Sequence, residues 1–492
     1  MVGDHHPGSK TYIMIQTGLS FRIGLERVHP RRSGKLILRP TYSNLFKVVN
    51  IKNNNNNADE SVQVGRKKHL RQGFNKSSYQ SGVSMRSTVD SLDVHFYLNK
   101  GLGSIVLLAA TGLALCFANM VTTASIYESF WHSRAGPQNL NLSMSLHHWV
   151  NEGLMALFFF TVGLEIKREF IHGSLSSMKQ AILPCIGALG GMFVPMLFYL
   201  AFNLTSPEGV VAGWAIPMAT DIAFAMGVYG FFKNKMPNGV AAFLLTLATV
   251  DDLGAILVIA IFFSKTLIKE YILAAIILSG IMFSACKMKI TNIKLYMSLF
   301  VLLWYCLLQG GINADIAGVI TALSIPGCAM APLDTKAPPE HDSQKVTLLD
   351  HLIYAWSPWT TLLVMPLFAL ANTAVLIDRA VVGSIFNSAV GQGIFFGLAL
   401  GKPIGIAGIS WIAVRSGLAK FPKGMGLKHL SVVGLLGGIG FTMSLFLIEM
   451  ALSGNYGAIR TAKMAILSSS FASAVLGCIL MHSFPEYEAK KN

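Results

Sequence analysis

Apolar residues dominate the chain from residue 101 onward, where they form long runs separated by short polar connections. Each run is about 16 to 25 residues long, which is the length that an α-helix needs to cross the hydrocarbon core of a bilayer. Twelve runs are expected, beginning near residues 102, 149, 179, 210, 238, 269, 294, 312, 352, 391, 428 and 459. The pattern predicts an all-α integral membrane protein with twelve transmembrane helices.

The composition agrees with a membrane protein. Hydrophobic residues make up 53% of the 492 positions, charged residues only 13%, and the mean hydropathy is +0.54. A water-soluble domain needs more charge on its surface than this. The net charge of +15 is concentrated in the first hundred residues, and no basic face is interleaved with aromatic residues, so nucleic-acid binding is disfavoured.

Three regions differ in character. Residues 1–95 are polar and basic, with an asparagine tract at 53–57, and we expect a disordered extension. An organellar transit peptide, or translation that starts at Met85, is an alternative. Residues 96–484 hold all twelve runs, and 485–492 form a short tail. Lys and Arg accumulate in one set of connections, which predicts that both termini are cytoplasmic.

Once the connections are set aside, four ionisable residues remain at membrane depth: Asp221, Asp251, Asp252 and Lys402. A charge at that depth costs at least a few kcal/mol, so it usually faces a water-filled cavity and marks an ion or proton path. Three acids and one base in a membrane domain predict a cation site.

Asp251 and Asp252 are adjacent in the apolar segment FLLTLATVDDLGAILVIAIFF. Neighbouring residues on a helix point about 100° apart, so one carboxylate can face a cavity while the other faces a partner. Burial and a neighbouring like charge both favour protonation, so proton loss and cation binding can compete there. A structural carboxylate network is the alternative interpretation.

Two runs contain residues that interrupt helices. Pro217 precedes Thr220 and Asp221, and a proline removes a helix hydrogen bond. We expect a break before Thr220, with the Asp221 carboxylate at the positive end of a half-helix. Gly438 and Gly440 in GLLGGIGFTMSLF favour a second break, although glycines in membrane helices also permit close packing. Two interrupted helices are typical of an ion site near the membrane midplane.

Lys402 lies in FFGLALGKPIGIAGISW, immediately before a proline. A buried lysine has to pair with an acid, approach a helix C-terminus or lose its proton. We expect it to pair with Asp251, which leaves Asp252 for the cation and couples cation binding to a second titrating group.

These motifs resemble those of the NhaA-type bacterial sodium/proton antiporters over residues 95 to 482. The matching stretches are LMALFFFTVGLEIKREF, GGMFVP, GWAIPMATDIAFAMGV, ATVDDLGAI, MPLFALANTAV, GKPIGI and GGIGFTMSLF. The resemblance implies twelve helices, with spans three to five and ten to twelve related as inverted repeats and two interrupted helices crossing near the site. This topology follows from the resemblance and not from the hydropathy pattern.

The resemblance also implies a function. Asp252 and Asp251 bind Na+ or Li+ and exchange protons, Thr220 and Asp221 line the crossing, and Lys402 pairs with the doublet. The expected protein is an electrogenic antiporter rather than an enzyme, with no cofactor beyond the transported ions. It lies in a bacterial inner membrane and forms a homodimer, partly through residues 126–148.

The chain departs from the family pattern at two places. An LEHxLHPW-like stretch linked to pH response is expected before the ninth span, but this chain reads LLDHLIYAWSPW, which keeps only the acid and histidine Asp350 and His351. Glu152 stands where the family often has Asp, and we interpret it as a rim acid. The charges in GLEIKREF, among them Glu165, Arg168 and Glu169, resemble a cytoplasmic funnel, with a stabilising ion-pair cluster as the alternative.

Two other functions use comparable residues. A Na+-coupled symporter of a small organic solute would need further polar groups to hold that solute. An intramembrane aspartyl protease also uses two aspartates, but from separate helices and with a GxGD motif, whereas here the doublet is contiguous and GGIGF lacks the acid. Antiport is the favoured interpretation.

Overall fold

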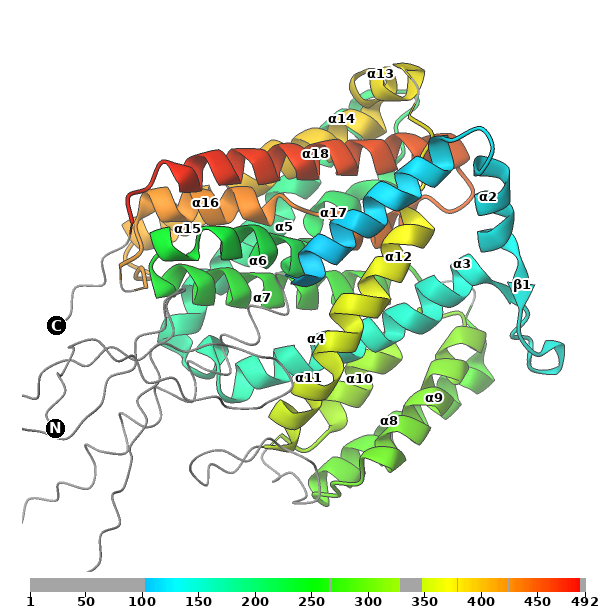
Figure 1. Ribbon diagram of the computed structural model, residues 1–492. Helices are drawn as coiled ribbons and strands as arrows, with labels where there is room; N and C mark the ends of the chain where they lie inside the picture. The colour runs from blue at the N-terminus through cyan, green and yellow to red at the C-terminus, as the bar shows by residue number, and fades with distance from the viewer. Residues whose placement is uncertain (1–101, 265–266, 328–346, 378, 423, 487–492) are drawn as a thin grey trace, which may run out of the picture. The chain divides into compact units, whose positions relative to one another are not determined.

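Helices form nearly all the regular structure in a computed structural model that describes residues 102–264, 267–327, 347–377, 379–422 and 424–486 (Figure 1). Two short strands are the exception, and they pair antiparallel with Arg134 opposite Ser145. The predicted extension at 1–95 and residues 487–492 of the predicted tail lie outside the described residues. Within the described part, the expected all-α class is confirmed.

The helical segments fall where the apolar runs begin, within a few residues. The first six expected spans correspond to the helix Leu102–Asn119, α3 (Leu146–His148) with η2 (Trp149–Leu154) and α4 (Met155–Ile171), α5 (Met178–Thr205), η4 (Val211–Met218) with α6 (Ile222–Phe231), α7 (Asn238–Phe262) and α8 (Lys269–Lys287). The last six are α9 (Ile293–Gln309), α10 (Ile316–Ser324), α11 (Leu348–Trp359) with η6 (Thr360–Val364) and α12 (Met365–Asn372), α14 (Ala389–Phe396) with η7 (Gly397–Gly401), η8 (Ile404–Gly408) and α15 (Ile409–Arg415), α16 (Leu427–Gly437) with α17 (Phe441–Ala451), and α18 (Tyr456–His482).

The remaining elements lie in the connections. They are α2 (Ala124–His132), β1 (Arg134–Ala135), η1 (Gln138–Leu140), β2 (Met144–Ser145), η3 (Ser174–Ser176), η5 (Lys233–Lys235) and α13 (Arg379–Asn387).

Length and composition support membrane crossing for most of these segments. Nine of them in the described chain are long and apolar enough to cross a bilayer as single helices, and α16 with α17 makes a tenth that bends by 45°. The other two, α9 and α10, are shorter, with 17 and 9 residues. The chain is therefore a multi-pass membrane protein, and α10 is the segment that departs most from a regular span.

Two spans are interrupted as expected. Between η4 and α6 the residues 219–221 leave the helix, starting two residues after Pro217, and between α16 and α17 the break covers 438–440. The two breaks touch, because the backbone N–H of Asp221 donates to the carbonyl oxygen of Ile439 at 2.8 Å. Continuous, interrupted and continuous spans thus follow one another twice, in α5 to α7 and in α14 to α18. The three spans of the first set and the four spans between the sets make seven crossings before α14, so the two sets run in opposite directions.

Glycines allow the helices around the site to approach closely. A Cβ on Gly190 of α5 would lie 2.3 Å from the carbonyl oxygen of Gly405 in η8, and a Cβ on Gly405 would lie 2.2 Å from the carbonyl oxygen of Gly190. This backbone contact holds α5 against the π-helical turns that flank Lys402. Four π-helical segments, η2, η6, η7 and η8, occur in the described spans, and such turns are frequent at functional sites.

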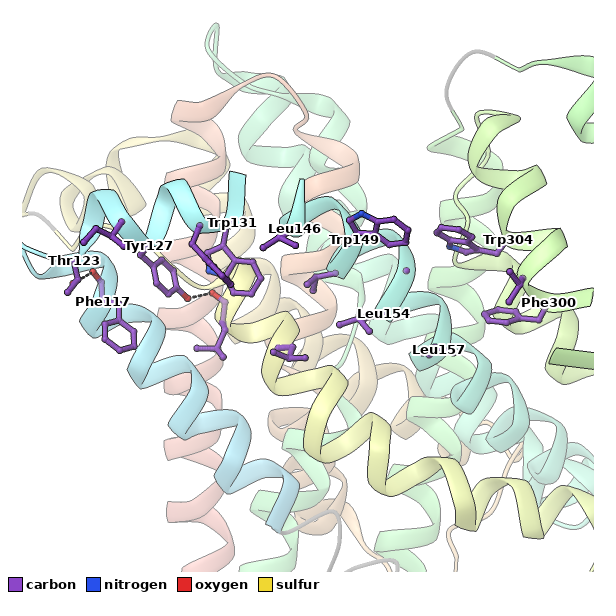
Figure 2. Close-up of a pocket in the computed structure, with 17 residues that line it drawn as sticks. Phe117, Thr123, Tyr127, Trp131, Leu146, Trp149, Leu154, Leu157, Phe300 and Trp304 are labelled. Carbon is purple, nitrogen blue, oxygen red and sulfur yellow. Dashed lines mark hydrogen bonds between the residues drawn. The ribbon is translucent and has the colours of Figure 1, made fainter. Parts of the chain in front are cut away.

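A second group of helices packs beside these. The contacts run from α8 to α9, from α9 to α10 and from α10 to α4, and Figure 1 shows α8 and α9 together beneath α10. An apolar groove of about 1080 Å³ lies among the first helix, α2, η2, α9 and α12 (Figure 2). Trp149 and Trp304 stack in it with ring centroids 5.8 Å apart. The acids of the expected ion site do not line this groove.

Candidate ion-binding site

The adjacent carboxylates lie in the middle of α7, in surroundings that exclude water. Asp251 and Asp252 are each 1% exposed, and most of the neighbouring residues on this helix are apolar. Because successive residues point in different directions, the two side chains have different environments. One faces a lysine and the other faces a small cavity, as expected from the sequence.

Asp251 is the partner of the buried lysine. Nζ of Lys402 lies 2.5 Å from Oδ2 of Asp251, and the two side chains are 0% and 1% exposed. Lys402 stands between two π-helical turns, with its backbone near that of α5. This ion pair confirms the expected pairing.

Thr220 completes the network around that pair. Its hydroxyl accepts a hydrogen bond from Nζ of Lys402 at 2.6 Å. The hydroxyl proton can be donated either to Oδ2 of Asp251 at 2.7 Å or to the carbonyl oxygen of Gly437 at 2.9 Å. The interrupted helices therefore meet the ion pair at one threonine, whose hydroxyl has two acceptors within reach.

Asp221 joins the two interrupted helices. Its Oδ1 accepts from the backbone N–H of Phe224 at 3.0 Å, so it caps the start of α6. Its Oδ2 accepts from the backbone N–H of Thr442 at 3.2 Å and from the Thr442 hydroxyl at 2.5 Å, at the start of α17. One carboxylate thus faces the positive ends of two half-helices. Its hydrogen bonds from Phe224 and Thr442 join the starts of α6 and α17.

Asp252 faces a cavity of about 40 Å³ that it shares with Asp221 and Glu165. The other lining residues are hydroxyl-bearing or apolar and come from α4, α6, α11, η6, α12 and α17: Phe158, Thr161, Val162, Ile222, Ala223, Ser357, Thr360, Thr361, Met365 and Met443. Oδ1 of Asp252 and Oδ1 of Asp251 have no hydrogen-bond partner among the described protein atoms. Carboxylate and hydroxyl oxygens are the ligands that hard cations prefer.

At the second break, the glycines leave room for neighbouring atoms and do not adopt unusual backbone angles. Gly438 has φ −69° and Gly440 has φ −83°, values that any residue adopts. A Cβ on Gly438 would lie 2.7 Å from the carbonyl oxygen of Leu398, and a Cβ on Gly440 would lie 2.3 Å from Oγ of Ser444. Close packing, the alternative raised for these glycines, explains them.

The residues considered for a funnel or pH response do not form one cluster, because each has different partners. Arg168 pairs with Asp350, Nε to Oδ1 at 3.3 Å, on a partly exposed surface. Glu169 instead accepts from the backbone N–H of Ser174 at 2.7 Å and from the Thr246 hydroxyl at 2.8 Å. His351 follows Asp350 on α11 and does not join the Arg168 pair.

Glu165 belongs to the ion cavity rather than to this surface. It lines the same space as Asp252. The sequence placed Glu165 near a span end, but the direction in which it points depends on the packing of α4 against α7 and η6.

Two buried acids were missed or misinterpreted. Glu152, expected to be a rim acid, is 4% exposed, and this interpretation was wrong because Trp304 and the start of α10 cover it. Asp315, which the sequence analysis did not single out, is 2% exposed at the start of α10. It lies about three residues after the expected start of the eighth span near residue 312, where an acid can still reach the polar membrane surface, so the sequence carries little signal of its burial.

No three His, Cys, Asp or Glu side chains of the described residues are grouped as in a resident metal centre.

Comparisons with known proteins agree with this geometry. The family model described as Na+/H+ antiporter 1 matches residues 95–481. The chain is 38% identical over 397 residues to the Na+/H+ antiporter NhaA of Aliivibrio salmonicida, an alignment that covers 80% of this chain and 98% of the relative. It is 39% identical over 390 residues to the Na+/H+ antiporter NhaA 2 of Clostridium beijerinckii, covering 79% of this chain and 93% of that one.

Proposed function

Because the chain belongs to the Na+/H+ antiporter 1 family, we propose that it exchanges Na+ or Li+ for H+ across a membrane, in sodium and pH homeostasis. The observation that carries this proposal is Asp252, a buried carboxylate with an unpartnered oxygen, which lines a small cavity together with two further acids and several hydroxyl groups. An ionised carboxylate in such a place needs a counter-charge, which a proton or a cation supplies. Because the same carboxylate oxygens bind the proton and the cation, binding of the proton excludes the cation and binding of the cation excludes the proton.

The pair formed by Lys402 and Asp251 provides a second titrating group. A cation that engages Asp251 competes with the lysine for the same carboxylate, and Lys402 then loses the charge that supports its protonated form. A proton leaves as the cation binds, and the reverse step restores the ion pair. Exchange of this kind moves more protonic charge inward than sodium charge outward, so we propose that transport is electrogenic.

The interrupted helices connect the site to a conformational change. Thr220 contacts Lys402, Asp251 and the carbonyl oxygen of Gly437, and Asp221 holds the starts of α6 and α17 together. A change of the hydrogen-bond acceptor of the Thr220 hydroxyl therefore affects both interrupted helices. We propose that α5 to α7 with α14 to α18 move against the group of α4 and α8 to α12, which exposes Asp252 alternately to the two sides.

The test is transport by the full chain in proteoliposomes whose interior is more acidic than the bath, so that external Na+ can exchange for internal H+. Addition of Na+ or Li+ should dequench an internal pH dye, whereas K+ at the same concentration should not. Absence of cation-dependent proton movement across the pH range would overturn antiport. A dependence on an added organic solute would instead favour the symporter, which the family does not support.

We also propose that the protein lies in a bacterial inner membrane with both termini in the cytoplasm. The support is the excess of Lys and Arg in one set of connections. A membrane-impermeant thiol reagent should then label a cysteine placed at Gln138 in intact cells and leave one placed at Lys233 unlabelled, in a chain whose native cysteines have been replaced. The opposite labelling would reverse the orientation.

A homodimer through residues 126–148 is part of the same proposal. This segment forms α2 and the pair β1 and β2, whose strands have exposed backbone edges. The apolar groove beside α2 and α9 is suited to lipid acyl chains near such a contact. Native mass measurement in detergent with added lipid should give a dimer, and deletion of residues 136–143 should give a monomer. A monomeric unaltered chain at every lipid content would refute this assignment.

A further inference from the structure

Glu152 and Asp315 form a second buried acidic pair that the transport mechanism does not use. Glu152 lies in the π-helical turn η2, and Asp315 is the residue before α10. They are 4% and 2% exposed. The pair lies far from the ion cavity, because 13 residues separate Glu152 from Glu165 on one helical segment, about 20 Å at 1.5 Å per residue.

The two carboxyl groups differ in the hydrogen bonds that they accept. Oε2 of Glu152 accepts from the backbone N–H of Ala314 at 3.4 Å, beside the positive end of α10. Neither Oδ1 nor Oδ2 of Asp315 has a hydrogen-bond partner among the described atoms. An ionised Asp315 would therefore be buried without any donor, next to the like charge of Glu152, whereas an ionised Glu152 has at least one donor.

The other described elements that pack on α10 bring no cation to this pair. Nζ of Lys167 in α4 donates to the carbonyl oxygens of Leu323 and Ile325 at the opposite end of α10. Lys269 and Glu270 of α8 and Lys294 of α9 are exposed. Glu152 is the other buried acid beside Asp315, because its Oε2 accepts from the N–H of the preceding residue, Ala314. Two adjacent buried carboxyl groups without a cation carry a proton between them.

We propose that Glu152 and Asp315 form a second proton-binding site, in which one proton is held on the Asp315 carboxyl group beside Glu152 at the start of α10. This proton is distinct from those exchanged at Asp252. Because η2 continues directly into α4, the site lies on the helix whose other end carries Glu165 into the ion cavity, so its protonation adds a second pH-sensitive element to the exchanger.

Infrared spectroscopy of the full chain in liposomes tests the proposal, which rests in part on the proposed exchange at Asp252. Saturating Na+ displaces protons from Asp251 and Asp252. A protonated aspartic acid that is still detected at saturating Na+ is therefore another residue. The carbonyl band of a protonated carboxyl should shift when aspartate is labelled with 13C at Cγ. It should be lost in Asp315→Asn and unchanged in Asp350→Asn, which removes an exposed acid. Absence of the band from the unaltered chain, or its persistence in Asp315→Asn, would overturn the proposal.

A second variant covers the case in which Asp315→Asn does not fold. In Asp315→Glu the band should no longer respond to labelled aspartate and should respond to labelled glutamate. A band that still follows the aspartate label contradicts the assignment. If Na+ does not bind at the doublet, the unaltered chain should show a further aspartate band even at saturating Na+, and that band should be absent from Asp252→Asn. Failure of the transport proposal is therefore distinguishable from failure of this one.

Discussion

Lys402 and Asp251 are ion-paired where neither side chain meets solvent, with Nζ 2.5 Å from Oδ2. Removing one partner of a buried ion pair leaves an uncompensated charge and costs about 3 to 5 kcal/mol, whereas replacing both partners is often neutral. The pair is therefore important for stability as well as for ion exchange, and the two roles can be separated by experiment.

The first prediction concerns this separation. Lys402→Met should lower the thermal unfolding midpoint in detergent, because it strands the Asp251 carboxylate. The double variant Lys402→Met with Asp251→Asn should recover most of that loss and still fail in proton-coupled exchange, since both titrating groups are gone. A double variant no more stable than the single one would show that the ion pair is not the cause.

The second prediction assigns the cation to Asp252. Asp252→Asn keeps the size of the side chain but removes the negative charge that faces the cavity, so Na+-dependent dequenching should fall to the level of empty liposomes. Stability should stay close to that of the unaltered chain, because no charged partner is left behind. Glu208→Gln, an exposed acid outside the cavity, serves as the matched control. Full exchange by Asp252→Asn would remove this residue from the cation site.

The third prediction concerns the bridge between the interrupted helices. Thr442→Val deletes a hydroxyl that donates to Asp221 while keeping nearly the same volume. A hydrogen bond to a charged group is worth roughly 1.5 to 3 kcal/mol, so the unfolding midpoint should drop and the exchange rate should fall with it. Thr442→Ser restores the hydroxyl and should recover both. Equal behaviour of the valine and serine variants would mean that the backbone bond alone holds the bridge.

The main residues of the ion site could be predicted from the sequence because charges stand out in apolar runs. Asp251, Asp252, Asp221 and Lys402 each interrupt a segment long enough to span a bilayer, and the pairing of Lys402 with Asp251 followed from the cost of a lone buried lysine. The breaks after Pro217 and at 438–440 followed from helix chemistry. Ion binding itself stays a prediction.

The rest depends on contacts between segments distant in sequence. Asp315 precedes a nine-residue helix at the start of an expected span, and the packing of α10 against α4, α8 and α9 covers this region. Glu152 is covered by Trp304, which lies on α9. Glu165 and Glu169 are four residues apart on α4, yet one lines the ion cavity and the other binds Thr246, a difference that helix periodicity alone does not give.

The last prediction tests the close approach of α5 and η8 behind Lys402. Gly405→Ala would place a methyl group 2.2 Å from the carbonyl oxygen of Gly190, so the two backbones have to separate. Overpacking of this kind costs about 1 to 3 kcal/mol, and the shift should also displace Nζ of Lys402 from Asp251 and slow exchange. Gly408→Ala lies in the same π-helical segment with nothing within 4 Å of the added Cβ, and it should leave both stability and transport unchanged. If the two alanine variants behave alike, the Gly190 contact does not position Lys402.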